Sequence, residues 1–335
     1  MDKVLVSAVQ TAPVFLNRNA TIEKACDLIA TASAKGASLI VFPEAFVPTY
    51  PDWVWVLPPG QNRQLADLYG QLVDQSITIP DSSTEKLCQA ARKARIHIAI
   101  GVSERNSDAS NSSLYNTMVY IGSDGTILGK HRKLVPTAPE RMIWAQGDGS
   151  TLDVYDTPFG KLGGLICWEN YMPLARHAMY ASGIRIYLAT TWDSGEPWLS
   201  TLRHIAKEGH VFVIGCCCAV RLSDIPDHYE FKKLYSKKDE WINAGDSAIV
   251  DPDGKFLAGP LNRSDDILYS ELDLRYGTGS RWKLDVAGHY SRPDVFQLTI
   301  NRQSYPQMRE AKPERASEAE ESEGDSKAGN GKREK

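Results

Sequence analysis

Three side chains of chemically useful type each follow a strand-like segment of the sequence. Glu44 and Cys167 come directly after apolar runs, and Lys133 follows the second strand of a predicted hairpin. A thiol, a carboxylate and an ammonium group are the types that nucleophilic catalysis uses for attack, proton transfer and charge stabilisation. Taken alone, each has a commoner explanation as a packed cysteine, a loop carboxylate or a solvated basic patch. Glu44 and Cys167 lie at carboxyl ends of buried-type strands, where open α/β folds gather ligand sites, and this position favours a functional site.

The other five cysteines have no spacing that suggests a metal site or a disulfide framework. The chain contains no Cys-x-x-Cys, and three consecutive cysteines cannot point the same way on a strand. The sequence also has no P-loop, no Rossmann glycine fingerprint and no metal-ligand spacing, so we expect neither a cofactor nor a metal ion. We interpret these cysteines as small buried hydrophobic residues: Cys26, Cys88, Cys216, Cys217 and Cys218.

The elements that must position the three candidates alternate between strand-like and helix-like segments. Continuous apolar runs are typical of strands buried on both faces, and apolar residues at helical spacing over 22–35 predict a helix that Gly36 ends. Ser82 and Glu85 form a capping-box pattern before a second helix. Periodicity alone therefore indicates an α/β protein. The predicted strands are 4–10, 38–43, 97–103, 162–166, 184–189, 211–219 and 267–272; the hairpins are 117–121 with 126–130 and 247–250 with 255–258; the helices are 22–35, 82–95, 173–182 and 197–209.

The composition is that of an ordinary soluble globular protein. The 335 residues are 42% hydrophobic and 24% charged, with a formal net charge of −4, which excludes collagen-like, disulfide-scaffold and wholly disordered classes. The slight acidity gives no reason to expect nucleic acid or a membrane surface as a partner. No apolar stretch reaches the roughly 18 residues of a membrane span, and the N-terminus runs into a strand pattern without a signal-peptide core. We therefore expect a cytoplasmic protein.

The last 26 residues, 310–335, differ in character from the rest of the chain. They contain eight acidic and six basic side chains, and no aromatic or β-branched residue. Such a segment cannot bury enough apolar surface to offset its ordering entropy, so we predict a disordered charged tail.

Longer motifs around the three candidate side chains resemble the nitrilase superfamily of carbon–nitrogen hydrolases. The match runs in the family's order over about residues 4–300 and includes Glu, Lys and Cys at the family's spacings. The motifs are Phe42-Pro43-Glu44-Ala45-Phe46, Gly129-Lys130-His131-Arg132-Lys133-Leu134 and Gly163-Gly164-Leu165-Ile166-Cys167-Trp168-Glu169-Asn170, with supporting segments Glu140-Arg141-Met142-Ile143-Trp144, Leu202-Arg203-His204-Ile205-Ala206 and Asp285-Val286-Ala287-Gly288-His289-Tyr290.

The resemblance implies a fold and an assembly. Family members are four-layer α-β-β-α sandwiches that pair through helices near the nucleophile and often form larger spiral oligomers or filaments. We therefore expect residues 1–280 to form a carbon–nitrogen hydrolase domain and residues 281–309 to form a C-terminal extension involved in packing or assembly. The expected partners are a small-molecule nitrile and further copies of this chain.

The resemblance also implies a role for each candidate. A nitrile carbon is a poor electrophile, so the attacking group must be a strong nucleophile, which Cys167 supplies as a thiolate. Lys133 and a backbone N–H near Trp168 would stabilise the negative charge on the nitrile nitrogen, and Glu44 would act as general base and acid. Glu140 matches a second family glutamate, which either only positions Lys133 through a salt bridge or orients the substrate or water directly.

The dipeptide after the nucleophile, Trp168-Glu169, is typical of the nitrilase branch. We expect hydrolysis of an organic nitrile to the carboxylic acid and ammonia through a thioimidate and a thioester. The alternatives are an aliphatic amidase or a cyanide-degrading enzyme of the same superfamily, or a catalytically silent filament-forming scaffold. Segment 190–193 lacks the proline that many nitrilases carry there, which leaves the acyl-side preference open. The expected substrate-binding residues, any tryptophan of which could instead be core packing, are Tyr50, Trp144, Trp168, Thr191 and Trp192.

Overall fold

The structure is a computed structural model that describes residues 2–236 and 239–306. The strands are β1 (Lys3–Gln10), β2 (Leu39–Val41), β3 (His97–Arg105), β4 (Leu114–Ile121), β5 (Ile127–Arg132), β6 (Val154–Tyr155), β7 (Leu162–Ile166), β8 (Ile186–Thr191), β9 (Phe212–Cys217), β10 (Ala219–Arg221), β11 (Trp241–Val250), β12 (Phe256–Asn262) and β13 (Asp266–Asp273). The helices are α1 (Arg18–Ala34), α2 (Asn62–Gln75), α3 (Ser82–Ala94), α4 (Pro173–Ala181), α5 (Glu196–Gly209) and α6 (Leu274–Gly279), with short 3-10 turns between them.

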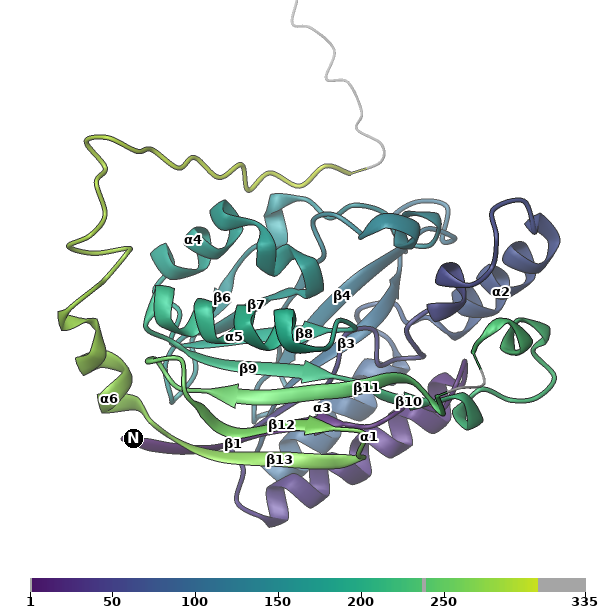
Figure 1. Cartoon of the computed structure of the whole chain (residues 1–335), viewed down its shortest axis with the longest axis horizontal. Helices are drawn as coiled ribbons and strands as arrows, with labels where there is room; N and C mark the ends of the chain where they lie inside the picture. Colours follow the sequence, from purple (N-terminus) through teal and green to yellow (C-terminus); the bar gives the residue numbers. More distant parts are fainter. Residues whose placement is uncertain (1, 237–238, 307–335) are drawn as a thin grey trace, which may run out of the picture.

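The strands form two sheets that lie face to face (Figure 1). The first sheet has the order β13-β1-β2-β3-β4-β5, and the second has the order β10-β11-β9-β8-β7-β6, with β12 pairing to β11. The central pairs β1/β2, β2/β3, β7/β8 and β8/β9 are parallel, and antiparallel strands flank them. The parallel centre places the carboxyl ends of β2 and β7 where the sequence analysis expects chemistry.

The apolar side chains divide into layers that explain the architecture. On the doubly buried strand β2, Leu39 and Val41 pack between the two sheets, whereas Ile40 packs on the opposite side, beneath α1 and α3. On β8, Leu188 faces the space between the sheets and Tyr187 faces α4 and α5. The alternation gives both faces of each strand an apolar layer to bury. The predicted four-layer α-β-β-α sandwich is therefore confirmed, with α1 and α3 outside one sheet and α4 and α5 outside the other (Figure 1).

Most predicted elements are present, and the differences have local causes. Helix α3 begins at Ser82 as expected, but its N-cap is Asp81, whose side chain accepts from the N–H groups of Ser83 and Thr84. The predicted Ser82–Glu85 capping box is therefore wrong by one residue, because a carboxylate at the preceding position captures the same free N–H groups. The predicted strand 211–219 is divided into β9 and β10, and α2 was not predicted from the sequence.

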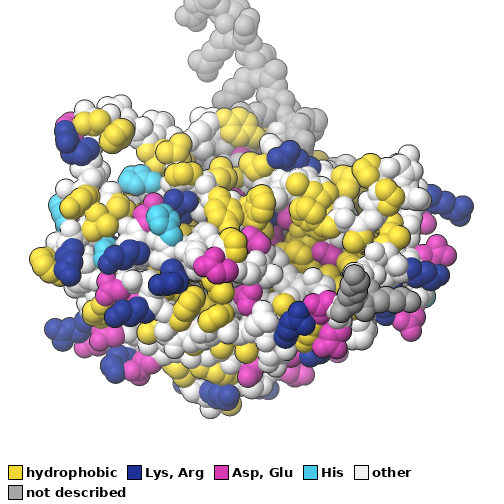
Figure 2. Space-filling view, viewed as in Figure 1, with side chains coloured by type: hydrophobic (Ala, Val, Ile, Leu, Met, Phe, Trp, Pro, Cys, Tyr) yellow, Lys and Arg dark blue, Asp and Glu magenta, His cyan; other side chains and the backbone are white. Residues whose placement is uncertain are grey.

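After α6 the chain continues to residue 306 with only one 3-10 turn, and Figure 1 shows this segment passing α4. The backbone N–H of Tyr305 donates to Asp148, and Arg302 donates to the carbonyl of Leu152. The predicted tail 310–335 lies outside the described residues, and the proposed domain boundaries stay predictions. On the face shown in Figure 2, positive and negative side chains are interspersed. No helix among the described residues is long and apolar enough to cross a membrane.

Candidate active site

Glu44 is delivered by a sharp turn at the carboxyl end of β2. Ala45, the next residue, has a φ of 46°, a left-handed conformation that is uncommon for a residue other than glycine. Gly101 on β3 lies so close that a Cβ there would come within 2.2 Å of the Pro43 carbonyl oxygen. The glycine thus lets β3 approach the turn, and the turn directs the fully buried Glu44 carboxylate inward.

Cys167 occupies a similar strained position after β7. Its φ is 54°, and it begins a 3-10 helix that runs from Cys167 to Tyr171. Backbone strain of this kind costs about 1–3 kcal/mol and concentrates at functional sites, where it aims a side chain. Trp168, the second residue of that 3-10 helix, carries a backbone N–H at the end where helical N–H groups have no partner within the helix. The predicted backbone donor therefore lies next to the thiol.

Lys133 joins these loops through ion pairs with two buried carboxylates. Its Nζ donates to Glu44 Oε1 at 2.9 Å and to Glu140 Oε2 at 2.7 Å. All three side chains are at most 1% exposed. The Cys167 Sγ and one oxygen of each carboxylate lie within 4.8 Å of one another. The structure thus brings together the four residues predicted to be catalytic.

The two oxygens of Glu44 have different surroundings. Oε1 accepts from Lys133 and, at 2.7 Å, from Nδ2 of Asn116 on β4. Oε2 is buried and has no hydrogen-bond donor among the residues that the structure describes. Because buried acceptors are seldom left without a donor, Oε2 is suited to receive the proton of the nearby thiol. Sequence reasoning missed Asn116, since an asparagine within a strand carries no motif.

The charges of the site determine its resting protonation state. Burial raises the pKa of the Cys167 thiol to about 12, the Glu44 charge adds to this effect, and Lys133 opposes it. Burial also raises the pKa of Glu44, although Lys133 lowers it in part. Burial alone would lower the pKa of Lys133, but the negative groups around it raise that pKa above its usual range. At neutral pH the thiol therefore holds its proton, and attack requires its transfer to a base in contact.

The same cluster of Glu44, Glu140 and Cys167 has donor atoms that are close enough together to ligate a metal ion. However, the Lys133 ammonium group already bridges the two carboxylates. A cation entering the cluster would meet this buried positive charge, so the residues do not fit a metal site.

A cavity of about 240 Å³ opens from Cys167 and Glu140. Of the predicted substrate-binding residues, Tyr50, Trp168 and Trp192 line it. The side chain of Thr191 instead lies close enough to the Cys167 thiol to lower its pKa, and it accepts from the N–H of Asp193. Trp144 lies behind Tyr50 with its indole N–H on Ser103, outside the lining. The full lining is Tyr50, Trp55, Thr137, Glu140, Cys167, Trp168, Trp192, Asp193, Ser194, Ile242 and Asn243.

Two of the aromatic walls are fixed by hydrogen bonds that the sequence does not indicate. The Tyr50 hydroxyl donates to Glu140 Oε1 at 2.7 Å and accepts from the Trp55 indole at 3.1 Å. Asp52 accepts from the Tyr235 hydroxyl at 2.6 Å, and the Trp192 side chain lies close enough to lower the pKa of its carboxyl. Burial raises the pKa of Asp52 to about 6. The pocket walls are thus connected to a half-buried carboxylate outside the catalytic cluster.

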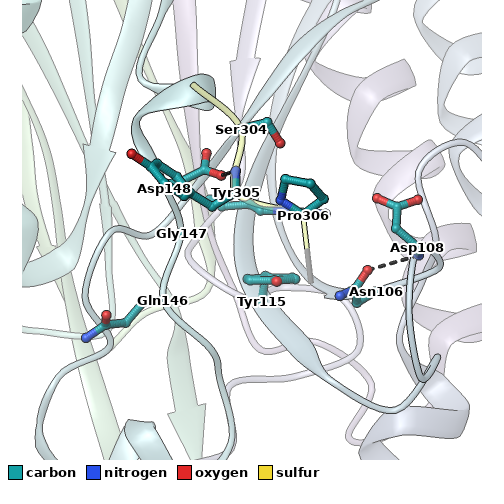
Figure 3. Close-up of a pocket in the computed structure, with 10 residues that line it drawn as sticks. Asn106, Asp108, Tyr115, Gln146, Gly147, Asp148, Ser304, Tyr305 and Pro306 are labelled. Atoms are coloured by element: carbon teal, nitrogen blue, oxygen red, sulfur yellow. Dashed lines mark hydrogen bonds between the residues drawn. The ribbon is translucent and has the colours of Figure 1, made fainter. Parts of the chain in front are cut away.

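A second cavity, of about 330 Å³, is lined by Tyr115, Gly147 and Asp148 among others, and Glu44, Lys133, Glu140 and Cys167 are not part of its lining (Figure 3). Figure 3 shows Ser304, Tyr305 and Pro306 crossing it beside Asp148. Although it is larger than the cavity at Cys167, no cysteine among the described residues lines it, so we assign the chemistry to the smaller one.

Four of the remaining cysteines fit the prediction of buried packing, and Cys26 is only partly buried. Cys216 Sγ contacts the carbonyl oxygens of Val9 and Val41 between the sheets, whereas Cys217 Sγ contacts Asn243. Consecutive cysteines therefore point in different directions, as strand geometry requires.

Comparisons with known proteins agree with this fold. Residues 5–281 match the family described as carbon–nitrogen hydrolase. The chain is 42% identical over 309 residues to an aliphatic nitrilase of Sinorhizobium fredii (strain HH103), covering 90% of this chain and 97% of that protein. It is also 42% identical over 304 residues to Nitrilase 2 of Arabidopsis thaliana, covering 89% of this chain and 88% of that protein. A bifunctional nitrilase/nitrile hydratase of Lupinus angustifolius is 39% identical over 303 residues, covering 89% and 86%.

Among solved structures, Nit3 of Saccharomyces cerevisiae superposes with a TM-score of 0.68 at 22% identity, covering 87% of this chain and 97% of that chain. The NitFhit protein of C. elegans also gives a TM-score of 0.68, at 21% identity, covering 92% of this chain and 69% of that chain. At these identities the likeness concerns the fold alone.

The protein therefore belongs to the carbon–nitrogen hydrolase family. Its relatives at about 40% identity place it in the nitrilase branch.

Proposed function

We propose that this protein is a nitrilase that converts an organic nitrile and two water molecules into a carboxylic acid and ammonia. The observation that carries the proposal is the Lys133 ammonium group, bound between Glu44 and Glu140 beside the Cys167 thiol. The nitrilase relatives support it.

The first half of the reaction forms the covalent intermediate. Glu44 Oε2 accepts the thiol proton as Cys167 Sγ attacks the nitrile carbon, and the nitrogen, which gains negative charge, receives that proton to give a thioimidate. Lys133 and the backbone N–H of Trp168 stabilise the charge that develops on the nitrogen. No net proton is consumed, so the carboxylate is ready for the next step.

The second half uses two water molecules. The first adds to the thioimidate carbon with Glu44 as base, and the C–N bond of the tetrahedral intermediate breaks to release ammonia and leave a thioester. The second hydrolyses the thioester, giving the acid and restoring the thiol. Glu140 keeps Lys133 in place and also faces the cavity, so it is suited to orient the substrate or the attacking water.

The test is ammonia release from aliphatic, arylacetonitrile and aromatic nitriles, with matched amides and cyanide as competing substrates. Cys167→Ala is expected to be inactive, whereas Cys26→Ala, at a cysteine far from the cluster, is expected to keep wild-type activity. Hydrolysis of amides without nitriles would support the amidase alternative, and cyanide alone would support the cyanide-degrading alternative. If the folded wild-type protein releases ammonia from none of these substrates, the result would support the alternative of a catalytically silent scaffold.

We also propose that the chain self-associates, through the groove between α4 and the segment after α6. This groove has a volume of about 460 Å³ and includes Leu174, Tyr290, Val295 and Phe296, all exposed. Contiguous exposed apolar side chains of this kind mark interaction surfaces. Leu174→Glu should reduce the mass measured by sedimentation; a monomeric wild type would contradict the proposal. The cytoplasmic location stays a prediction.

A further inference from the structure

Glu169 lies two residues after the nucleophile, and its carboxylate binds the backbone of both catalytic loops. Its Oε2 accepts from the N–H of Ile166 at 2.8 Å, just before Cys167. Its Oε1 accepts from the N–H of Leu134 at 2.6 Å, just after Lys133. The residue is only 3% exposed. One short, buried side chain therefore contacts the immediate neighbours of both the nucleophile and the ammonium group.

The two loops come from different sheets. Ile166 ends β7 in the second sheet, and Leu134 follows β5, the last strand of the first sheet. Hydrogen bonds between neighbouring strands fix positions within one sheet but not between two sheets that pack through side chains. The Glu169 carboxylate provides a polar connection between the sheets at the point where Cys167 and Lys133 must meet.

His131 holds that carboxylate in place. Its Nε2 lies 3.0 Å and 3.2 Å from the two Glu169 oxygens, and its Nδ1 lies 3.1 Å from the Thr151 carbonyl. Because both nitrogens face acceptors, both carry protons and the ring is an imidazolium. Burial would lower the pKa of His131, but Glu169 raises it; burial would raise the pKa of Glu169, but His131 lowers it. His131 and Glu169 thus form a buried ion pair. Each Glu169 oxygen faces one backbone N–H group and the His131 ring.

We propose that Glu169, held by His131, is a positioning residue that sets the separation of the Cys167 thiol and the Lys133 ammonium group across the two sheets. We call Glu169, with its hydrogen bonds to the N–H groups of Ile166 and Leu134, the clamp. The proposal rests on the proposed function, because the clamp is assigned to that reaction. Glu169 acts through the backbone of Ile166 and Leu134 rather than on the substrate.

The effect of removing the clamp follows from its acceptors. Glu169→Gln keeps the shape but has one carbonyl oxygen and one amide group that only donates, so the N–H of either Ile166 or Leu134 loses its acceptor. A misplacement of about 1 Å at a reacting group costs on the order of 100-fold in rate. We expect kcat per folded chain to fall by about 10- to 100-fold, with KM changed less than about 3-fold, since Glu169 does not line the cavity.

The experiment compares Glu169→Gln with Glu208→Gln in the full chain. Glu208 is a matched control, because it also accepts from a cation, Arg176, and from Tyr180, but these donors are side chains of α4 rather than the backbone of either loop. The fraction of folded chains is measured by near-UV circular dichroism, and kcat is calculated per folded chain, whereas KM needs no such correction. A role in folding only would lower this fraction and leave kcat per folded chain unchanged.

The rate at which iodoacetamide alkylates Cys167 at pH 7.5, followed by mass spectrometry, gives a readout that does not depend on nitrile turnover. Because Lys133 lowers the pKa of the thiol, its displacement should slow alkylation of Cys167 by about 10-fold in Glu169→Gln and leave the rate unchanged in Glu208→Gln. Wild-type protein that is alkylated normally but hydrolyses no nitrile would refute the proposed function without bearing on the clamp.

Equal alkylation rates and equal kcat per folded chain in Glu169→Gln and wild type would overturn the clamp. If Glu169→Gln does not fold, His131→Gln, which removes the imidazolium but leaves the carboxylate, takes its place. It should show the same slowed alkylation and the same loss in kcat with unchanged KM, and wild-type values there would equally refute the proposal.

Discussion

Trp192 lies flat against Tyr50, with the ring centroids 4.4 Å apart and an angle of 5° between the planes. The Tyr50 hydroxyl donates to Glu140, and Trp192 lies close enough to Asp52 to lower the pKa of that carboxyl. The stacked pair therefore forms one wall of the cavity that opens from Cys167 and Glu140.

Trp192→Ala should change substrate preference more than catalytic rate. Loss of the indole removes apolar contact with small nitriles and enlarges the cavity, so KM for small aliphatic nitriles should rise about 10-fold, and kcat/KM for bulky aryl nitriles should rise relative to them. Trp192→Phe, which keeps a stacking ring, should stay within about 3-fold of wild type. Trp282→Ala, at an exposed position after α6, is the control. An unchanged ratio of kcat/KM values in Trp192→Ala would contradict this role.

Lys133→Ala should lose both activity and stability. Removal of a preorganised cationic donor costs about 100-fold or more in kcat, and it leaves Glu44 and Glu140 buried without their partner, which destabilises by about 3–5 kcal/mol. The deficit in unfolding free energy should shrink as pH falls from 7 to 5, because the unpaired carboxyls can then be protonated. Denaturant titration at several pH values and kcat measurements check both parts. A variant that keeps more than a tenth of wild-type kcat would show that the electrostatic role is wrong.

Asp52 should make stability depend on pH in a direction opposite to that of a carboxylate whose pKa falls on folding, such as Glu169. Its pKa is raised to about 6 in the folded protein from an ordinary 3.8. The folded state therefore binds more protons than the unfolded state between these values, so the contribution is present below about pH 4 and lost as pH rises through 6. Asp52→Asn keeps an oxygen that can accept from Tyr235 and does not titrate. The difference in melting temperature, variant minus wild type, should rise between pH 4.5 and pH 7.5; a constant difference would refute the assignment.

The products should be mainly acid and ammonia, and chelators should have no effect. Ammonia leaves the tetrahedral intermediate when its nitrogen is protonated, and expulsion of the thiolate instead gives the amide. Glu44 is placed to deliver that proton, whereas Lys133 disfavours a second positive charge nearby. Electron-withdrawing α-substituents make the nitrogen less basic, so they should raise the amide fraction, in the direction of the bifunctional relative.

Chromatography of acid and amide across a series of α-substituted nitriles, with and without EDTA, measures this partition. Amide as the main product of every substrate, or activity lost to EDTA, would favour a hydratase over the proposed mechanism.

Much of the site could be predicted from local sequence, because the chemistry is attached to strand ends. The apolar runs before Glu44 and Cys167 identify buried strands, and buried strands deliver the residue that follows them to the edge of a sheet. Lys133 follows a hairpin strand whose register is set by its own turn. These relationships extend over a few residues, so the local sequence determined which side chains stand at strand ends, and the resemblance to the family indicated that they act together.

Contacts between distant segments were decided only by the tertiary structure. Asn116 carries no local signal, and the motif that contains Glu169 does not indicate what its carboxylate binds, since both roles depend on which backbone or carboxylate packing places against these side chains. The local sequence does not distinguish Trp144 from Trp55. In the structure Trp144 is buried behind Tyr50, whereas Trp55 lines the cavity. A tryptophan suits both a core and a wet pocket, so its side chain follows whichever surface the two sheets and their loops leave beside it.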